Sequence, residues 1–238
     1  MQIEGRNAVM EALKNDREID YIYIKKGDNE GSITKIIGKA KDKKIMIKIV
    51  DRNKLDEMSE SENHQGVIAI ANEYKYHELE DVLEETREKP GFFIILDEIE
   101  DPHNLGAIIR SAEASGVDAI IIPKRRACQV NATVEKTSAG ATSHMKIIRV
   151  TNLVQTIEKM KEAGIWIYSV DMDGSEYTKT DLKGKIALVI GSEGKGISRL
   201  IKEKSDFTIS IPMKGHINSL NASVAASVLM FEAVRQRG

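Results

Sequence analysis

Cysteine and aromatic residues are scarce in this sequence, and each scarcity excludes a class of structure or site. The single cysteine, Cys128, cannot form a disulfide within the chain, and it offers no zinc cluster. Phe, Trp and Tyr make up 5% of the 238 residues, so an aromatic platform that stacks nucleobases is not the expected mode of binding. One cysteine fits a reducing compartment.

Long apolar runs are also missing. No stretch approaches the length of a membrane-spanning helix, and residues 1–16 lack the apolar core of a secretion signal. We therefore expect a soluble cytoplasmic protein. The five histidines show no order that suggests a nucleophilic triad. Asp171, Asp173 and Asp181 lack the spacing of metal ligands, so no metal site is expected.

The formal net charge is small, but it is unevenly distributed. The whole chain carries a charge of −2, with 35 basic and 37 acidic residues. Residues 1–72 hold 13 of each sign, residues 73–89 hold 3 basic and 7 acidic residues, and residues 90–238 hold the remaining 19 basic and 17 acidic residues. The acidic stretch therefore masks two bodies that can each carry a basic patch for nucleic acid.

The pattern of apolar residues indicates two α/β domains. In residues 1–72 it predicts helices at 5–13 and 33–40 and strands at 21–25, 45–50 and 67–71. Residues 73–89 are acidic, with helical spacing at Leu79, Val82 and Leu83, and Pro90-Gly91 follows them. We assign residues 73–89 to a linker, either a rigid helix or a hinge, and residues 90–238 to a second domain.

The second domain alternates strands and helices. A continuous apolar run begins at Phe92, as in a strand that is buried on both faces of a parallel sheet. Further strands are expected at 118–123, 145–150, 165–170, 186–191 and 207–211, and helices at 105–115, 131–139, 153–163 and 219–237. This alternation predicts a doubly wound, mostly parallel sheet.

The first candidate site is the segment 96–116, LDEIEDPHNLGAIIRSAEASG, which leaves a buried strand and opens a helix. Ligands bind beyond the carboxyl ends of strands in such sheets, which is where Asp97, Glu98 and Asn104 fall. Arg110 follows in an otherwise small or apolar context and needs an anion or hydrogen-bond acceptors. A helix cap at Asp101 or Asn104 with an ordinary ion pair to the arginine explains the segment equally well.

The second candidate site is the segment 186–198, IALVIGSEGKGIS, in which a strand runs into a loop with three glycines. Such a loop lets backbone groups approach a ligand closely. It matches neither a phosphate-binding P-loop nor the GxGxxG dinucleotide motif. Glu193 would repel a phosphate, so a cation or a ribose hydroxyl is the better ligand. A tight turn with Glu193 in solvent is the alternative.

The third candidate site lies in residues 209–237, where a strand is followed by a polar loop and a helix rich in small residues. Asn218 or Ser219 is expected to cap the helix, whose small residues permit either ordinary packing or a dimer contact. A further loop of small residues, KTSAGATSH at 136–144, is a candidate second wall of the pocket.

Together these stretches resemble the three motifs of the SpoU (TrmH) family of SPOUT RNA ribose 2′-O-methyltransferases. The matching segments are DPHNLGAIIRSAEASG, LVIGSEGKGIS and IPMKGHINSLNASVAASVLMFEA, in the family's order and spacing. The N-terminal segment, which begins GRNAVMEAL and closes with HQGVIAIA, resembles the family's substrate-binding domain, which is similar in fold to ribosomal protein L30e. The closest resemblance is to bacterial 23S rRNA guanosine 2′-O-methyltransferases of the RlmB type.

The resemblance implies a trefoil-knotted domain that binds S-adenosylmethionine in the knot, and a homodimer whose active sites take residues from both chains. By position, it implies donor contacts at Gly191, Ile211 and Leu220, with Ala139 and Gly140 as weaker candidates, and a catalytic cluster of Asn104, Arg110, Glu193, Ser219 and Asn221. The substrate would be RNA, rRNA rather than tRNA, and the small domain would read RNA shape through Lys and Arg contacts to phosphates.

The implied reaction is in-line attack of a ribose 2′-hydroxyl on the donor's methyl group. Arg110 is the family's proposed base, but arginine has a pKa above about 12. The alternative is that Arg110 stays charged and holds the neighbouring phosphate and hydroxyl. A tRNA methyltransferase, an RNA-binding ribosome-assembly factor with a vestigial pocket, and a nucleotide-binding oxidoreductase are the rival interpretations of the chain, the last disfavoured by the missing GxGxxG.

Overall fold

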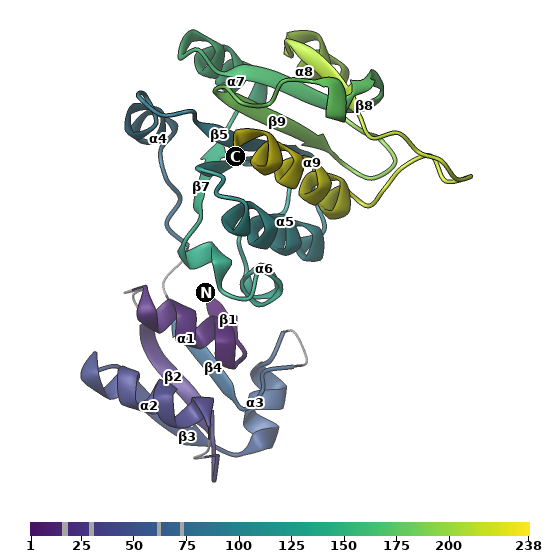
Figure 1. The fold of residues 1–238 in the computed structure, drawn as a ribbon. Helices are drawn as coiled ribbons and strands as arrows, with labels where there is room; N and C mark the ends of the chain where they lie inside the picture. The colour runs from purple at the N-terminus through teal and green to yellow at the C-terminus, as the bar shows by residue number, and fades with distance from the viewer. Residues whose placement is uncertain (16–18, 29–30, 61–62, 72–73) are drawn as a thin grey trace. The chain divides into compact units, whose positions relative to one another are not determined.

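The computed structural model describes residues 1–15, 19–28, 31–60, 63–71 and 74–238 (Figure 1). The chain divides into two compact units, of which the first comprises residues 1–75 and 130–144 and the second residues 76–129 and 145–238. The expected boundary between residues 72 and 73 lies outside the described residues. Two α/β bodies are thus present. Residues 130–144, which the sequence analysis had assigned to the second domain, belong to the first unit.

The first unit is built on a four-stranded mixed sheet of order β1-β4-β2-β3. Strands β2 and β3 are parallel, whereas β4 is antiparallel to both β1 and β2. Its elements are β1 (Gln2–Glu4), α1 (Arg6–Lys14), β2 (Ile19–Lys25), α2 (Ser32–Asp42), β3 (Met46–Val50), α3 (Arg52–Met58), β4 (Val67–Ala71), α6 (Ala132–Thr137) and the 3-10 turn η1 (Ala141–Ser143).

The core of this unit follows from the predicted helical spacing. Val9 and Leu13 of α1 and Ile33 and Ile36 of α2 are fully buried, together with Ile22 of β2. The helices and strands expected in residues 1–72 are therefore confirmed. The elements β1 and α3, of three and seven residues, were not predicted, because such short segments carry little periodic pattern.

The segment 130–144 packs within the first unit. Glu135 of α6 is fully buried, and its carboxylate accepts a hydrogen bond of 2.5 Å from the hydroxyl of Thr142. Gly140 has a positive φ of 90°, and a Cβ atom added there would lie 2.6 Å from the Cβ of Glu11 on α1. This close approach places the loop against α1. The sequence had assigned the segment to the domain 90–238, because periodicity says nothing about which body a loop joins.

The second unit is built on a six-stranded sheet of order β10-β8-β9-β5-β6-β7, in which all neighbouring strands are parallel. The prediction of a mostly parallel sheet is thus confirmed. Its elements are α4 (Leu79–Glu85), β5 (Phe92–Asp97), α5 (Pro102–Ala114), β6 (Ala119–Pro123), β7 (Lys146–Val150), α7 (Leu153–Glu162), β8 (Trp166–Glu176), the 3-10 turn η2 (Tyr177–Lys179), β9 (Ile186–Gly191), α8 (Arg199–Lys204), β10 (Phe207–Ser210) and α9 (Ala222–Arg237).

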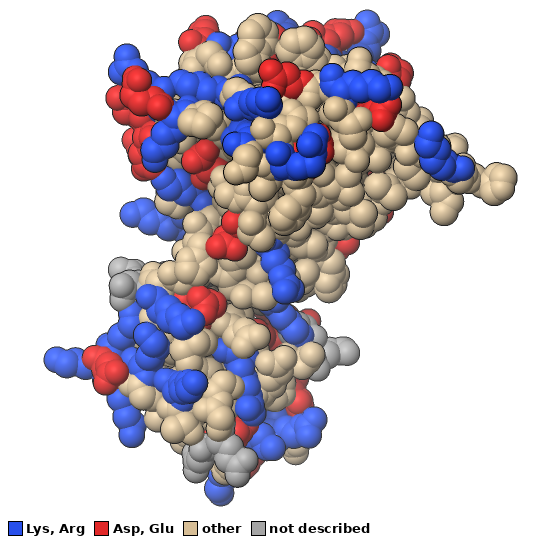
Figure 2. Space-filling view, viewed as in Figure 1, with Lys and Arg blue, Asp and Glu red and all other residues tan. Residues whose placement is uncertain are grey.

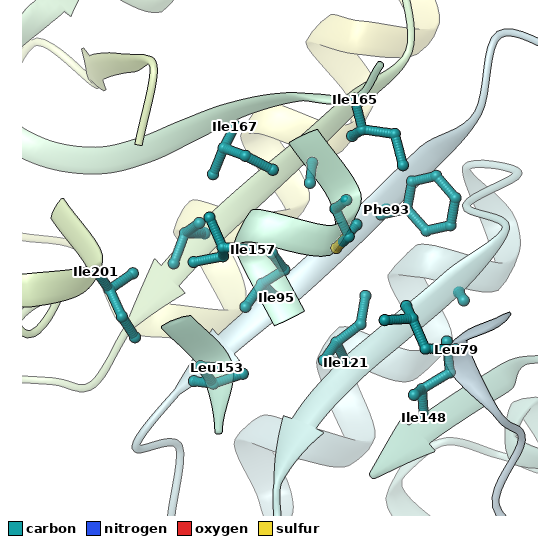
Figure 3. Packing of buried hydrophobic residues seen from close by; sticks show 14 of the residues in the cluster. Leu79, Phe93, Ile95, Ile121, Ile148, Leu153, Ile157, Ile165, Ile167 and Ile201 are labelled. Atoms are coloured by element: carbon teal, nitrogen blue, oxygen red, sulfur yellow. The ribbon is translucent and has the colours of Figure 1, made fainter. Parts of the chain in front are cut away.

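Helices cover both faces of this sheet. Helices α5 and α9 pack side by side on one face (Figure 1). On the other face, Ile157 of α7 and Ile201 of α8 pack against Phe93 and Ile95 of the central strand β5 (Figure 3). Alternate residues of a strand point to opposite faces, and every residue of β5 is buried. The continuous apolar run at β5 thus predicted a strand with two covered faces correctly.

The acidic stretch 73–89 contributes a helix to this core. Leu79 and Val82 of α4 are 5% and 1% exposed and belong to the same apolar cluster as Ile148 of β7 (Figure 3). The apolar positions that were noted in the sequence therefore anchor the helix to the second unit. Among the described residues, no helix is long and apolar enough to cross a membrane.

Candidate active site

The glycine loop after β9 is held in a tight turn at the carboxyl end of the sheet. The amide of Gly196 donates to the carbonyl of Ser192 at 2.9 Å, and the Ser192 amide donates back to Gly196 at 3.2 Å. A Cβ atom on Gly191 would lie 2.2 Å from the carbonyl carbon of Gly196. No side chain fits there, so the backbone of Gly191 itself forms the wall of any site in this loop.

A cavity of about 370 Å³ opens beside this loop. Its walls come from the middle of β8, the end of β9 with the glycine loop, the loop after β10 and the start of α9. The apolar lining includes Met172, Ile190, Ile211 and Leu220. The structure thus brings three of the sequence-predicted donor contacts, Gly191, Ile211 and Leu220, into one cavity.

Three polar residues that lie far apart in the sequence meet at the edge of this cavity. The Oε1 atom of Glu193 accepts hydrogen bonds from the Nδ2 atom of Asn104 at 3.0 Å, from the Nδ2 atom of Asn221 at 2.5 Å and from the amide of Ala222 at 3.3 Å. Asn221 also donates to the Oδ1 atom of Asn104 at 2.9 Å. The Glu193 carboxylate is therefore a structural acceptor that joins one residue from each of the three motifs.

Each member of this cluster is positioned by the end of an element. Asn104 lies in the first turn of α5, which begins at Pro102 with Asp101 as its cap. Asn221 caps α9, because its Oδ1 atom accepts from the amides of Ser223 and Val224. The expectation that Asn218 or Ser219 caps this helix was wrong. The helix begins at Ala222, and residues 212–219 form an exposed loop instead.

Ser219 and Arg110 occupy different places from the cluster. Ser219 lines the cavity and makes no hydrogen bond to any residue that the structure describes. Arg110 lies six residues after Asn104 on α5, which puts it about a third of a turn away around the helix. Its side chain is exposed, and it has no ion pair or hydrogen bond within the described part of the chain. Within the described part of a single chain, Arg110 therefore has neither the hydrogen-bond acceptors nor the ordinary ion pair that its sequence context suggested.

Ala139 and Gly140 are not among the residues that line the cavity. Both belong to the segment 130–144 of the first unit, where Gly140 lies against Glu11. The sequence-predicted site residues thus fall into three groups. Those in the cavity or its cluster are Asn104, Gly191, Glu193, Ile211, Ser219, Leu220 and Asn221, whereas Arg110 is separate on α5 and the pair 139–140 is in the other unit.

Neighbouring charges support the same loops. The buried carboxylate of Asp97, at the end of β5, accepts from the amide of Ser198 at 2.7 Å and so fixes the chain after the glycine loop. A hydrogen bond from Lys202 lowers the pKa of the Asp171 carboxyl, which lines the cavity. In the described residues, no group of three or more His, Cys, Asp or Glu could hold a metal ion.

Two lining residues, Met172 and Met213, carried no signal in the sequence. Met172 lies on the part of β8 beyond residue 170, where the predicted strand ended. Met213 lies in the polar loop of the third candidate segment, 209–237, but was not singled out there. One buried polar atom also lines the cavity without a partner in the described residues, the hydroxyl of Ser192. A bound molecule with a hydrogen-bonding group would satisfy it.

Family comparisons identify what this site belongs to. Residues 2–77 match the family described as "RNA 2'-O ribose methyltransferase substrate binding", and residues 91–231 match the family described as "SpoU rRNA Methylase family". The fold and the three-motif site are thus those of an RNA methyltransferase. The chain belongs to the SpoU rRNA methylase family, because that match alone spans more than half of its length.

Close relatives cover almost the whole chain. The chain is 49% identical over 237 residues to "Putative TrmH family tRNA/rRNA methyltransferase YacO" of Bacillus subtilis (strain 168), covering 98% of this chain and 94% of that protein. It is 46% identical to "Putative TrmH family tRNA/rRNA methyltransferase" of Staphylococcus aureus (strain COL), covering 99% and 96%.

Solved structures show the same fold. The SpoU methyltransferase AviRb from Streptomyces viridochromogenes has a TM-score of 0.86 at 22% identity, covering 100% of this chain and 89% of that one. The same protein in complex with the cofactor AdoMet has a TM-score of 0.83, covering 100% and 90%. The second unit therefore has the SPOUT methyltransferase fold, preceded by a substrate-binding domain, as the sequence predicted.

Proposed function

We propose that this protein transfers a methyl group from S-adenosylmethionine to a ribose 2′-hydroxyl of RNA, at a guanosine of 23S rRNA. The observation that carries the proposal is the convergence of Asn104 and Asn221 on one carboxylate oxygen of Glu193 beside the glycine-loop cavity. Such a cluster offers fixed polar groups at the point where a hydroxyl would meet a bound donor. Orientation of two reactants is what this reaction needs most.

The cavity suits the proposed donor. The apolar side chains of Ile211 and Leu220 can hold an adenine ring, and the bare backbone of Gly191 permits close contact. The unpartnered Ser192 hydroxyl offers a hydrogen bond to a polar group of the donor. When bound, S-adenosylmethionine supplies a methyl group that its sulfonium already activates. The fold that holds it is proposed to include the trefoil knot of the SPOUT family.

Arg110 is proposed to act on the RNA as a charged group. An exposed guanidinium without an intramolecular partner can hold a phosphate and the neighbouring hydroxyl in a bidentate manner. Because Asn104 lies on another side of α5, Arg110 is proposed to serve the site of a second copy of the chain. The proton of the 2′-hydroxyl then leaves by a route that does not require a neutral arginine.

A homodimer fits the surface of α9. Val224 and Phe231 are 47% and 49% exposed, and they lie with Val228 on one side of the helix at spacings of four and three residues. The face around α5 and α9 is largely free of charged side chains in Figure 2. Exposed apolar side chains on one side of a helix, within a face with few charges, are typical of a contact with another protein surface.

The direct test is a transfer assay with labelled S-adenosylmethionine and separated rRNA and tRNA, followed by mapping of the modified ribose. We expect label in 23S rRNA at a single guanosine 2′-oxygen. Label in tRNA instead would overturn the rRNA assignment and keep the reaction, which the relatives' names tRNA/rRNA methyltransferase also allow. No transfer to either RNA by folded protein would overturn the enzyme and favour a non-catalytic assembly factor.

The role of Arg110 is tested in the same assay. Arg110→Ala is expected to lower the turnover number about 100-fold or more, within the range that a positioned group contributes, and to leave donor binding unchanged. Arg199→Ala, which removes another exposed arginine of the second unit, is the control and should stay within about twofold of wild type. Near-normal turnover of Arg110→Ala would exclude both the base and the orienting role.

A further inference from the structure

Besides the proposed donor cavity of the second unit, the protein has a cavity lined only by residues of the first unit, among them three Lys and Arg side chains. It has a volume of about 440 Å³ and is open to solvent. Its lining residues come from the start of α1, the end of β2 and the loop after it, the start of α3 and the turn before β4, and they are Arg6, Lys25, Asp28, Arg52, Gln65 and Gly66. Nothing in the proposed reaction uses this cavity.

One cation of this cavity is held in a fixed orientation. The Nε atom of Arg6 donates to the backbone carbonyl of Gln65 at 2.9 Å, and its Nη2 atom donates to Asp28 at 2.7 Å. The side chain of Arg6 is 33% exposed and that of Asp28 is 15% exposed. Two of the five guanidinium N–H groups are therefore used for positioning, and the remaining three are available to a ligand.

The turn at Gly66 makes this arrangement possible. Gly66 has a positive φ of 82°, and a Cβ atom there would lie 2.7 Å from the Oδ2 atom of Asp28. Its amide donates to the Nδ1 atom of His64 at 2.9 Å, and its carbonyl accepts from the amide of Lys25 at 2.9 Å. Glycine at this position therefore lets the Asp28 carboxylate reach Arg6 without a clash.

The other two cations are available to a ligand. Lys25 has no ion pair with any described residue. Among the described residues, Arg52 pairs only with Asp56, at 3.6 Å, and both side chains are mostly exposed, at 71% and 52%, so that pair is weak. Asp28 is already paired with Arg6. The cavity thus presents three cations against one lining carboxylate, that of Asp28.

The amino end of α1 lies at this cavity, because Arg6, the first residue of the helix, lines it. The cap residue Gly5 has no side chain to accept a hydrogen bond, and the Arg6 amide donates to the side chain of Gln65 at 3.1 Å. The positive end of the helix dipole therefore adds to the field of the three cations, a combination that favours a bound anion.

We infer that this cavity binds a backbone phosphate of the substrate RNA. The inference rests on the proposed function, because RNA is the polyanion on which the enzyme acts, and residues 2–77, which hold the whole cavity, match the family model for substrate binding. Arg6 supplies a preoriented fork, and Lys25 and Arg52 supply the charge. In Figure 2, Lys and Arg also predominate over Asp and Glu on the visible face of the first unit. The contact carries no base information and sets the position of the RNA.

The test uses the full chain with the double substitution Lys25→Ala and Arg52→Ala, which leaves the structural Arg6 in place. The affinity for in vitro transcribed 23S rRNA, and for tRNA in parallel, is measured at salt concentrations between about 50 and 200 mM. Each lost phosphate contact should weaken binding about tenfold near 0.1 M salt and reduce the slope of log K against log salt by about 0.7–0.9. The KM for RNA should rise, whereas the turnover number and the affinity for S-adenosylmethionine stay unchanged.

The matched control is Lys35→Ala with Lys41→Ala, which removes the same charge from exposed positions of α2 in the same unit. It should keep an affinity within about threefold of wild type, as expected for general field effects that salt screens. Equal losses in the two double variants would overturn the cavity as a specific site, as would wild-type affinity and slope in Lys25→Ala/Arg52→Ala. Unchanged thermal unfolding shows that the variants are folded. Failure of the wild type to methylate any RNA would instead overturn the proposed function.

Discussion

At the scale of single residues, the site depends on one carboxylate that sequence chemistry alone could not interpret. A glutamate in a glycine loop argued against a phosphate ligand, which left a cation, a ribose hydroxyl or solvent as its partner. In the structure its partners are instead three hydrogen-bond donors: the side chains of Asn104 and Asn221 and the amide of Ala222. The residue therefore ties together three loops, and its charge is used to position its neighbours.

Glu193→Gln should reduce turnover about 100-fold, since an amide gives weaker, uncharged hydrogen bonds and a misplacement of about 1 Å has a cost of that size. The turnover number with RNA is the measurement. Glu113→Gln is the matched control, because Glu113 is an exposed residue near the end of the same helix as Asn104 and should behave as wild type. Wild-type turnover in Glu193→Gln would mean that the cluster plays no part in the reaction.

At the scale of elements, backbone contacts fix the loop after β9, and side-chain hydrogen bonds fix the end of α9 in the second unit. The glycine loop closes on itself because residues 191 and 196 touch through their backbones. At its carboxyl end, α9 is anchored by side chains. Gln236 accepts from the amide of Leu182, and Arg237 donates to the carbonyls of Leu182 and Gly184.

Gly191→Ala should abolish measurable donor binding and destabilise the protein by about 1–3 kcal/mol, because the new methyl group would overlap the backbone of Gly196. Calorimetric titration with S-adenosylmethionine and thermal unfolding are the measurements. Gly184→Ala is the control, since a Cβ atom there meets nothing within 4 Å. Normal donor affinity in Gly191→Ala would show that the donor does not use this loop.

The end of α9 should also respond to pH. Hydrogen bonds from Arg235 and Gln236 lower the pKa of Glu232 to about 2, from an ordinary value of 4.5. A lowered folded-state pKa contributes stability that is present above the unfolded pKa and is lost as pH falls towards the folded value. Glu232→Gln should therefore lower the Tm by about 2–4 °C at neutral pH, with the difference disappearing between pH 4.5 and about 2.

Thermal unfolding of Glu232→Gln and wild type at several pH values makes this comparison, with Glu88→Gln as the control. Glu88 is exposed and has no ion pair with a described residue, so its substitution should leave the Tm nearly unchanged at every pH. A Tm difference for Glu232→Gln that stays constant down to pH 2 would contradict the assigned titration.

At the scale of the whole molecule, the first unit is assembled from two separate segments of the chain, and the proposed active site requires a second copy of the chain. The first unit is completed by residues 130–144, which are inserted between strands of the second unit in the sequence. Deleting residues 1–72 would therefore leave α6 and η1 without the partners on which they pack, such as Glu11 beside Gly140. Substitution of surface charges is a cleaner way to separate RNA binding from donor binding.

The proposed dimer gives a prediction at the scale of the whole molecule. Phe231→Glu should convert a dimer to a monomer, because it replaces the largest exposed apolar side chain of the stripe on α9 with a charge, and RNA turnover should fall with it. Light scattering after size-exclusion chromatography is the measurement. Met46→Glu, at a 62% exposed apolar residue of the first unit, is the control and should remain dimeric. A dimeric Phe231→Glu would place the interface elsewhere.

The sequence by itself determined the longer elements, the parallel sheet and the motifs, because these depend on local periodicity and on residue types at fixed spacings, whereas the short elements β1, α3 and α8 were not predicted. It placed Asn104 and Glu193 in loops that follow buried strands, since such residues fall at the carboxyl edge of a parallel sheet, but it put Asn221 inside the helix expected at 219–237. It did not give the cap of α9, because Asn218, Ser219 and Asn221 all have capping side chains and only the path of the loop selects one.

Only the tertiary structure decided which segments share a body and which side chains meet. The loop 130–144 joined the first unit because Gly140 lacks a side chain and can approach α1. Glu193 met Asn104, 89 residues away, because β5 and β9 are hydrogen-bonded neighbours in the sheet. Neither pairing has a local signature, because contacts between distant residues depend on strand order and packing, which residue spacing along the chain does not record.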